Sequence, residues 1–69
     1  MLQIFRDGLA VDTSKIWYIE VEQADDEEFP FAVCAYNINE EYVVLEWFET
    51  QEKANIYVDR VVERINECP

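Results

Sequence analysis

The hydrophobic pattern of residues 41–67 changes its period partway along, and this change limits the folds that the chain can adopt. Val43, Leu45 and Trp47 alternate with other residues, which is typical of a strand with one apolar face. Apolar side chains then recur at the spacing of one helical face, at Ala54, Tyr57, Val58, Val61, Val62 and Ile65. A strand and a helix of this kind form a small core when the helix packs on the sheet.

The helix has recognisable start signals. Thr50 occupies the position of an N-cap, and Glu52 places a negative charge near the positive end of the helix dipole. Glu49 and Lys53 are spaced as an i, i+4 pair, which adds a weak stabilising interaction. We therefore expect a helix over residues 51–66.

Strands are predicted from β-prone residues between turn signals, at residues 2–5, 9–11, 16–22, 31–37 and 42–48. Asp7-Gly8 is a strong turn dipeptide, so the first two segments are expected to form a hairpin. Residues 37–40 are expected to form a second turn, because asparagine tolerates the left-handed conformation. Residues 12–15 are turn-rich, and Asp12 or Thr13 alternatively caps a single helical turn there.

These segments predict an α+β fold in one domain, residues 1–69. We expect an antiparallel β-meander of three main strands, or of four to five with the N-terminal hairpin, and one C-terminal helix packed on one face. The expected core is apolar and comes from both layers: Ile4, Trp17, Ile19, Val21, Val33, Val43, Leu45, Trp47, Ala54, Val58, Val61, Val62 and Ile65.

The chain is strongly acidic, with 16 acids against 5 bases and a formal net charge of −11. Its 51% hydrophobic content is too high for a disordered acidic tail, so the charge belongs to a folded domain. Residues 1–50 have twelve acids against two bases, or −10, and the rest of the chain has only −1. Such a surface repels nucleic acid and anionic membranes and attracts basic proteins.

The sheet face opposite the helix is the candidate binding surface, because it combines aromatic side chains with carboxylates. Aromatic anchors inside a charged rim are common at protein–protein contacts, although tyrosines and hydrated glutamates also occupy ordinary open faces. The candidate partner-binding residues include the acidic loop that follows the strand predicted at residues 16–22. They are Tyr18, Glu20, Glu22, Asp25, Asp26, Glu27, Glu28, Tyr36, Tyr42, Glu46 and Phe48.

Fixed carboxylates in this region have the potential to imitate a phosphate backbone. Glu20 and Glu22 lie about 6.6 Å apart along a strand, at about 3.3 Å per residue. We expect Glu46 beside them and the loop Asp25–Glu28 to extend the array. A folded acidic array of this kind can occupy the nucleic-acid groove of another protein.

No catalytic motif is present in the sequence. The chain has no histidine, so it lacks an imidazole base and a histidine metal ligand. Residues 25–28 lack the spacing and the glycine of an EF-hand, and Cys34 is expected to be a buried, inert thiol while Cys68 is exposed. We expect no enzyme activity, no cofactor and no metal.

The sequence therefore favours a small acidic non-catalytic protein-binding module, in its sharpest form an inhibitor that mimics nucleic-acid charge. The alternative is a structural or accessory module that dimerises through its aromatic sheet face. The partner is thus a basic protein or a second copy of the chain. We expect a cytoplasmic protein without membrane contact, because the chain lacks a signal peptide and the ~20-residue apolar run of a membrane span.

Overall fold

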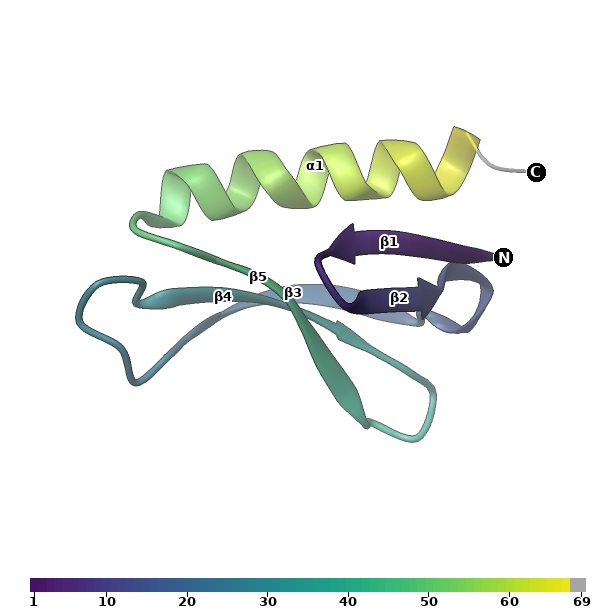
Figure 1. Cartoon of the computed structure of the whole chain (residues 1–69), viewed down its shortest axis with the longest axis horizontal. Coiled ribbons are helices and arrows are strands. Elements are labelled where there is room, and N and C mark those ends of the chain that lie inside the picture. Colours follow the sequence, from purple (N-terminus) through teal and green to yellow (C-terminus); the bar gives the residue numbers. More distant parts are fainter. Residues whose placement is uncertain (68–69) are drawn as a thin grey trace.

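A computed structural model describes residues 1–67 and shows an α+β fold (Figure 1). The elements in chain order are β1 (Leu2–Arg6), β2 (Leu9–Asp12), a 3₁₀ turn (Thr13–Lys15), β3 (Tyr18–Gln23), β4 (Phe31–Tyr36), β5 (Tyr42–Phe48) and α1 (Gln51–Glu67). The predicted class and the order of the elements are confirmed. The alternative prediction for residues 12–15 is also correct, because the Asp12 side chain accepts a hydrogen bond from the Ser14 N–H and caps the 3₁₀ turn.

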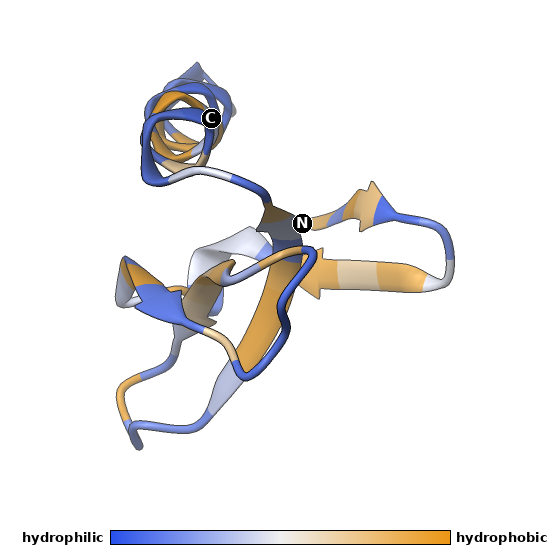
Figure 2. Ribbon diagram, turned by 90° about the vertical axis from the view of Figure 1, so that its left-hand side faces the viewer, coloured by the Kyte–Doolittle hydropathy of each residue, from blue (hydrophilic) through white to orange (hydrophobic). Residues whose placement is uncertain are grey.

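The strands form two separate antiparallel sheets. β3, β4 and β5 form a three-stranded meander with β4 in the centre, and β1 pairs with β2 in a second sheet. Figure 1 shows α1 and the β1–β2 hairpin on the same side of the meander. Figure 2, which views α1 along its axis, shows the hairpin beside the helix rather than beneath it. The helix and the hairpin therefore both cover the same face of the meander.

The core lies between the meander and these two covering elements. Its buried members are Val33, Ala35, Leu45, Ala54 and Val61. Partly buried side chains from every element surround them, including Phe5, Leu9 and Val11 of the hairpin. Nine of the predicted core residues lie here: Ile19, Val21, Val33, Val43, Leu45, Ala54, Val58, Val61 and Ile65.

A β-bulge in β5 reverses the orientation of the last residues of that strand. Val33 pairs with Glu46 but the next residue, Cys34, pairs with Val44, so β5 has one extra residue at Leu45. As a result Trp47 is 38% exposed and lies on the face opposite the helix. Phe48 instead contacts Tyr57 of α1, with ring centroids 5.1 Å apart. The predictions that Trp47 is in the core and that Phe48 is on the opposite face are therefore wrong.

Three further core predictions are wrong for local reasons. Ile4 is 72% exposed, because Phe5 is the β1 residue that packs against the core. Trp17 is exposed because the chain leaves the 3₁₀ turn with Ile16 against the core, and β3 begins only at Tyr18. Val62 lies at the edge of the helical stripe and is exposed.

The helix start agrees with its sequence signals. The Thr50 hydroxyl accepts a hydrogen bond from the Lys53 N–H at 3.2 Å, and Lys53 lies 3.9 Å from Glu49. In the predicted β4–β5 turn, Glu40 has a φ of 64° and is the residue in the left-handed region, although an asparagine was expected there.

Candidate protein-docking face

The open face is the face of the meander that points away from α1. The strand register and the alternation of side chains place three cross-strand rows on it. These rows are Tyr18–Tyr36–Tyr42, Glu20–Cys34–Val44 and Glu22–Ala32–Trp47. The prediction that Tyr18, Glu20, Glu22 and Tyr42 share one face is confirmed, and Tyr36, whose orientation the sequence leaves open, lies on the same face.

The three tyrosines form a continuous row of rings across the sheet. The Tyr18 and Tyr36 rings are stacked, with centroids 4.6 Å apart and an interplanar angle of 5°. The Tyr42 ring follows at 5.4 Å from Tyr36, and the Trp17 ring lies edge-on to Tyr18 at 5.6 Å. Aromatic pairs of this kind stabilise antiparallel strands. The two end tyrosines of the row, Tyr18 and Tyr42, are exposed.

Glu22 is held in place by the tyrosine row. Its carboxylate accepts a hydrogen bond from the Tyr36 hydroxyl. This bond, together with burial and the charge of Glu22, raises the pKa of Tyr36 above its usual value. The pKa of Tyr18 is also raised, by burial and then by the charges of Glu20, Glu40 and Glu22. The tyrosine row therefore lies in the negative field of these carboxylates.

Small residues of the central strand form the floor of the open face. Cys34 is only 2% exposed, and Ala32 is also buried, although neither belongs to the core beneath the helix. Burial, followed by the hydrogen bond and the charge of Glu22, raises the pKa of the Cys34 thiol to about 11. A thiol in this state is a poor nucleophile, as expected from the sequence. Cys68 lies outside the described residues.

The acidic loop between β3 and β4 is organised by one of its own side chains. The Asp26 carboxylate accepts hydrogen bonds from the backbone N–H groups of Glu28, at 2.8 Å, and Phe29, at 3.1 Å. Asp25, Glu27 and Glu28 are exposed around this turn. Because the loop continues directly from the Glu22 end of β3, it extends the negative charge of the open face past Trp47.

Glu46 does not lie beside Glu20 and Glu22, because β4 separates β5 from β3. Glu46 is opposite Val33, and its charge contributes, after burial, to the raised pKa of Tyr57 on the helix. With Asp26, Phe29 and Trp47 it lines a hollow of about 270 Å³ at the edge of the sheet. The prediction for Glu46 is thus wrong: Glu46 shares its register position with the core residue Val33 and not with Glu20 and Glu22.

One cation borders the open face. The Arg6 guanidinium lies 4.9 Å from the centre of the Trp47 ring and donates a hydrogen bond to the Val44 carbonyl at 3.3 Å. This carbonyl lies at the free edge of β5, next to the bulge. Arg6 therefore covers the edge of the meander and shows that Trp47 can hold a cation on its ring.

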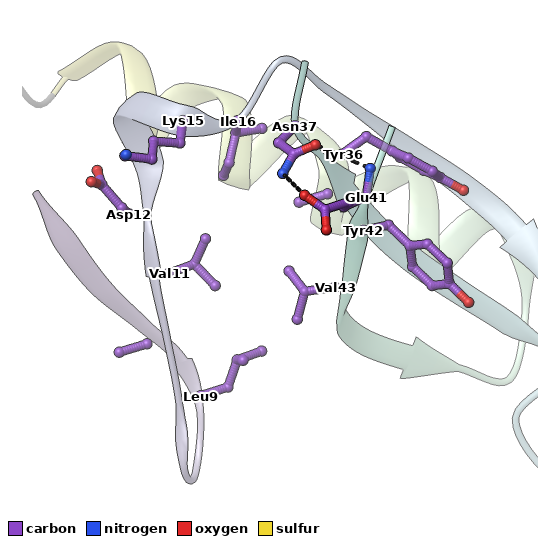
Figure 3. A pocket seen from close by; sticks show the side chains of 12 residues that line it. Leu9, Val11, Asp12, Lys15, Ile16, Tyr36, Asn37, Glu41, Tyr42 and Val43 are labelled. Atoms are coloured by element: carbon purple, nitrogen blue, oxygen red, sulfur yellow. Dashed lines mark hydrogen bonds between the residues drawn. The ribbon is translucent and has the colours of Figure 1, made fainter. Parts of the chain in front are cut away.

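A second hollow, of about 420 Å³, lies between β2 and the start of β5. Figure 3 shows Leu9 and Val11 pointing across it toward Val43. At its rim, Asn37 donates a hydrogen bond to the Glu41 carboxylate at 3.1 Å. No pattern in the sequence signals this cavity, because it depends on how the hairpin packs against the meander.

Comparison of the chain with protein-family models, with curated proteins and with solved structures finds no match. Within residues 1–67, no cluster of three or more histidine, cysteine, aspartate or glutamate side chains has a geometry that could hold a metal ion. The one helix of this part of the chain has neither the length nor the apolar character needed to cross a membrane.

Proposed function

We propose that this chain is a non-catalytic acidic binding module that docks on the basic surface of another protein in the cytoplasm. The observation that supports this proposal most is the separation of charge. Residues 16–52, which include the whole meander and its loops, contain eleven acids and no lysine or arginine. Three of the five bases of the chain are on α1, on the other side of the sheet.

The tyrosine row supplies the apolar part of the proposed interface. Interfaces are enriched in tyrosine and tryptophan, which bury a large area with little loss of side-chain freedom. Tyr18, Tyr42 and Trp47 are exposed on the open face, and each lies close to a carboxylate or to the acidic loop. Arginine side chains suit such a surface, because a guanidinium stacks on an aromatic ring and also pairs with a carboxylate.

In its most specific form, the proposal is that the chain is an inhibitor that mimics nucleic-acid charge. Glu20 and Glu22 provide fixed charges about 6.6 Å apart, at about 3.3 Å per strand residue, and the acidic loop continues the series. A surface of this kind competes with phosphates for lysine and arginine side chains. The same charge repels phosphate, so we expect no direct binding to nucleic acid or to an anionic membrane.

Self-association through the open face is disfavoured by its charge. Two copies packed face to face would bring the carboxylates Glu20 and Glu22 of both chains into one interface. Like charges in an interface oppose association strongly. The open face therefore suits a basic partner better than a second copy.

Competition with nucleic acid tests the proposal. The immobilised chain is incubated with nuclease-treated cell extract at about 50 mM salt, where exposed charges are weakly screened. Each captured protein is purified and bound to labelled duplex DNA or RNA, and the free chain is titrated into the complex. We expect the chain to displace the nucleic acid, and the displacement to weaken at about 500 mM salt.

Matched charge reversals provide the control for that experiment. E20K with E22K should abolish displacement, whereas E52K with E63K makes the same change in net charge on exposed helix positions and should preserve most of it. Capture of no nucleic-acid-binding protein would refute the mimic. Equal loss in both double variants would refute the assignment to the open face.

A further inference from the structure

The hollow at the edge of the meander combines aromatic and acidic residues. Its volume is about 270 Å³, and it is lined by Asp26 and Phe29 of the acidic loop and by Glu46 and Trp47 of β5. Pockets for drug-sized molecules typically measure about 300–1,000 Å³. The hollow therefore suits a group of the size of one side chain.

The loop wall of the hollow is held in place by hydrogen bonds within the loop. The Ala24 N–H donates to the Pro30 carbonyl at 2.7 Å, which closes the base of the acidic loop. Inside the loop, Asp26 Oδ1 accepts the bonds from the N–H groups of Glu28 and Phe29. Asp26 and Phe29 are thus positioned before a ligand arrives, so binding requires little further ordering of this wall.

Both carboxylates of the hollow keep one oxygen free of hydrogen bonds within residues 1–67. Asp26 uses Oδ1 for its two backbone bonds, and Glu46 uses Oε1 to accept the Trp47 N–H at 3.1 Å. Neither residue forms an ion pair in the described part of the chain. Their charges are therefore available to a cation from another molecule.

Trp47 already has one cation on its ring. The Arg6 guanidinium lies 4.9 Å from the ring centre, within the ~6 Å range of a cation–π contact. Arg6 is bonded to the Val44 carbonyl and does not line the hollow, so it does not fill this space. Residues 16–52 contain no other base that could neutralise the two carboxylates. The hollow therefore retains negative charge beside an aromatic ring that accepts a guanidinium.

We propose, on the basis of the docking function given above, that this hollow binds the guanidinium group of an arginine side chain of the basic partner. A guanidinium is planar, so it stacks on an aromatic ring, and its five N–H donors can pair with carboxylates in more than one direction. A lysine ammonium is a compact and more strongly hydrated charge without a planar surface. The hollow therefore selects arginine over lysine.

An NMR titration with small probes tests the hollow without the partner. N-acetyl-arginine methylamide and N-acetyl-lysine methylamide are each titrated into the isotope-labelled chain at equal ionic strength. We expect the arginine probe to shift the signals of the Trp47 indole N–H and the Phe29 amide, with a Kd about threefold or more below that of the lysine probe. Trp17 is the internal control, because it is exposed beside the tyrosine row and outside the hollow.

The indole signal of Trp17 should not move in this titration. Equal shifts at Trp17 and Trp47 would overturn the assignment to the hollow, and equal affinity for the two probes would overturn the choice of arginine. W47L removes the ring from the hollow, so the Phe29 amide should no longer shift, whereas W17L should bind the arginine probe as the native chain does. A dispersed amide spectrum checks that both variants are folded.

Matched charge variants test the two carboxylates. D26N with E46Q removes both charges but keeps the acceptor oxygens of their backbone hydrogen bonds, and it should weaken binding of the arginine probe about fivefold or more. E27Q with E28Q makes the same change of net charge on the acidic loop outside the hollow, and its effect should be less than about twofold. Equal weakening in the two double variants would mean that the probe is attracted by the acidic surface in general, and the site would be refuted.

Two results distinguish the arginine site from the function proposed above. A native chain that displaces nucleic acid from a captured protein but does not bind the arginine probe would refute the arginine site alone. A native chain that binds the probe in the hollow but captures no nucleic-acid-binding protein would refute the mimic and leave the arginine site supported.

Discussion

The open face is exposed to solvent, yet its side chains are held in place by contacts among Glu22, Tyr36 and Cys34. Cys34 is small, so the longer side chains beside it can lie across the sheet and bury its thiol. Tyr36 then donates its hydroxyl hydrogen to the Glu22 carboxylate. One hydrogen bond thus fixes both a tyrosine of the aromatic row and a charge of the proposed interface.

This arrangement predicts an altered titration of Tyr36. We expect its pKa to lie above the usual value of 10.0, with the hydrogen bond to Glu22 as the largest cause. NMR of ring-labelled tyrosine measures this pKa. Because the folded pKa is above the unfolded one, the associated stability is present below about pH 10 and is lost as pH rises further. E22Q should lower the pKa of Tyr36, whereas E20Q removes the same charge without removing the hydrogen bond and should have a smaller effect. Equal effects of E22Q and E20Q would contradict the assigned bond.

The bulge in β5 decides which aromatic side chain supports the helix. F48A should destabilise the fold by roughly 2–3 kcal/mol, somewhat less than the loss of a fully buried phenylalanine, because Phe48 is partly buried against Tyr57. W47A should cost less, about 1 kcal/mol, since Trp47 is exposed on the open face. Urea unfolding of both variants measures the order. A larger loss in W47A would mean that the strand alternates without a bulge.

The start of α1 depends on one capping side chain, Thr50. T50A should reduce the free energy of unfolding by about 1 kcal/mol, because the Lys53 N–H loses its side-chain acceptor. T50S keeps the hydroxyl and should be nearly neutral. E49Q removes the exposed pair with Lys53 at 3.9 Å and should change stability by no more than about 0.5 kcal/mol. Urea unfolding that ranks E49Q above T50A in cost would contradict the capping role.

Sequence periodicity predicts these elements well where each one follows its ideal repeat. The alternation of β3 correctly places Tyr18, Glu20 and Glu22 on one face, and the helical stripe correctly places Ala54, Val58 and Val61 in the core. A bulge adds one residue without any compositional signal, so Trp47 and Phe48 lie on the opposite faces of the sheet from those predicted. Local sequence patterns also do not predict how elements that are distant in the sequence pack against one another.

The packing of the hairpin on the meander is the clearest example of this limit. It determines that Phe5 rather than Ile4 packs against the core and that a cavity opens between β2 and β5. None of these features follows from residues 1–15 alone. They depend on which apolar side chains the three-stranded sheet leaves uncovered beside α1.

At the scale of the whole molecule, self-repulsion should limit stability. The radius of gyration is 11.8 Å, and the Debye length falls from about 30 Å at 0.01 M salt to about 10 Å at 0.1 M. At the lower salt, therefore, nearly all carboxylates of the folded chain repel one another, whereas unfolding moves them apart. The residues of α1 contribute only −1, so the repulsion is concentrated in the sheets and loops.

Added salt should consequently stabilise the fold. The free energy of unfolding by urea should rise as sodium chloride increases from about 0.01 M to about 0.5 M, with most of the gain below about 0.1 M, where the Debye length becomes shorter than the molecule. E27Q with E28Q removes two exposed charges of the acidic loop and spares the Asp26 turn. This variant should be more stable than the native chain at low salt and should gain less from added salt. If the two proteins gained equally, the stabilisation would come from a general salt effect on apolar burial rather than from screening of the acidic surface.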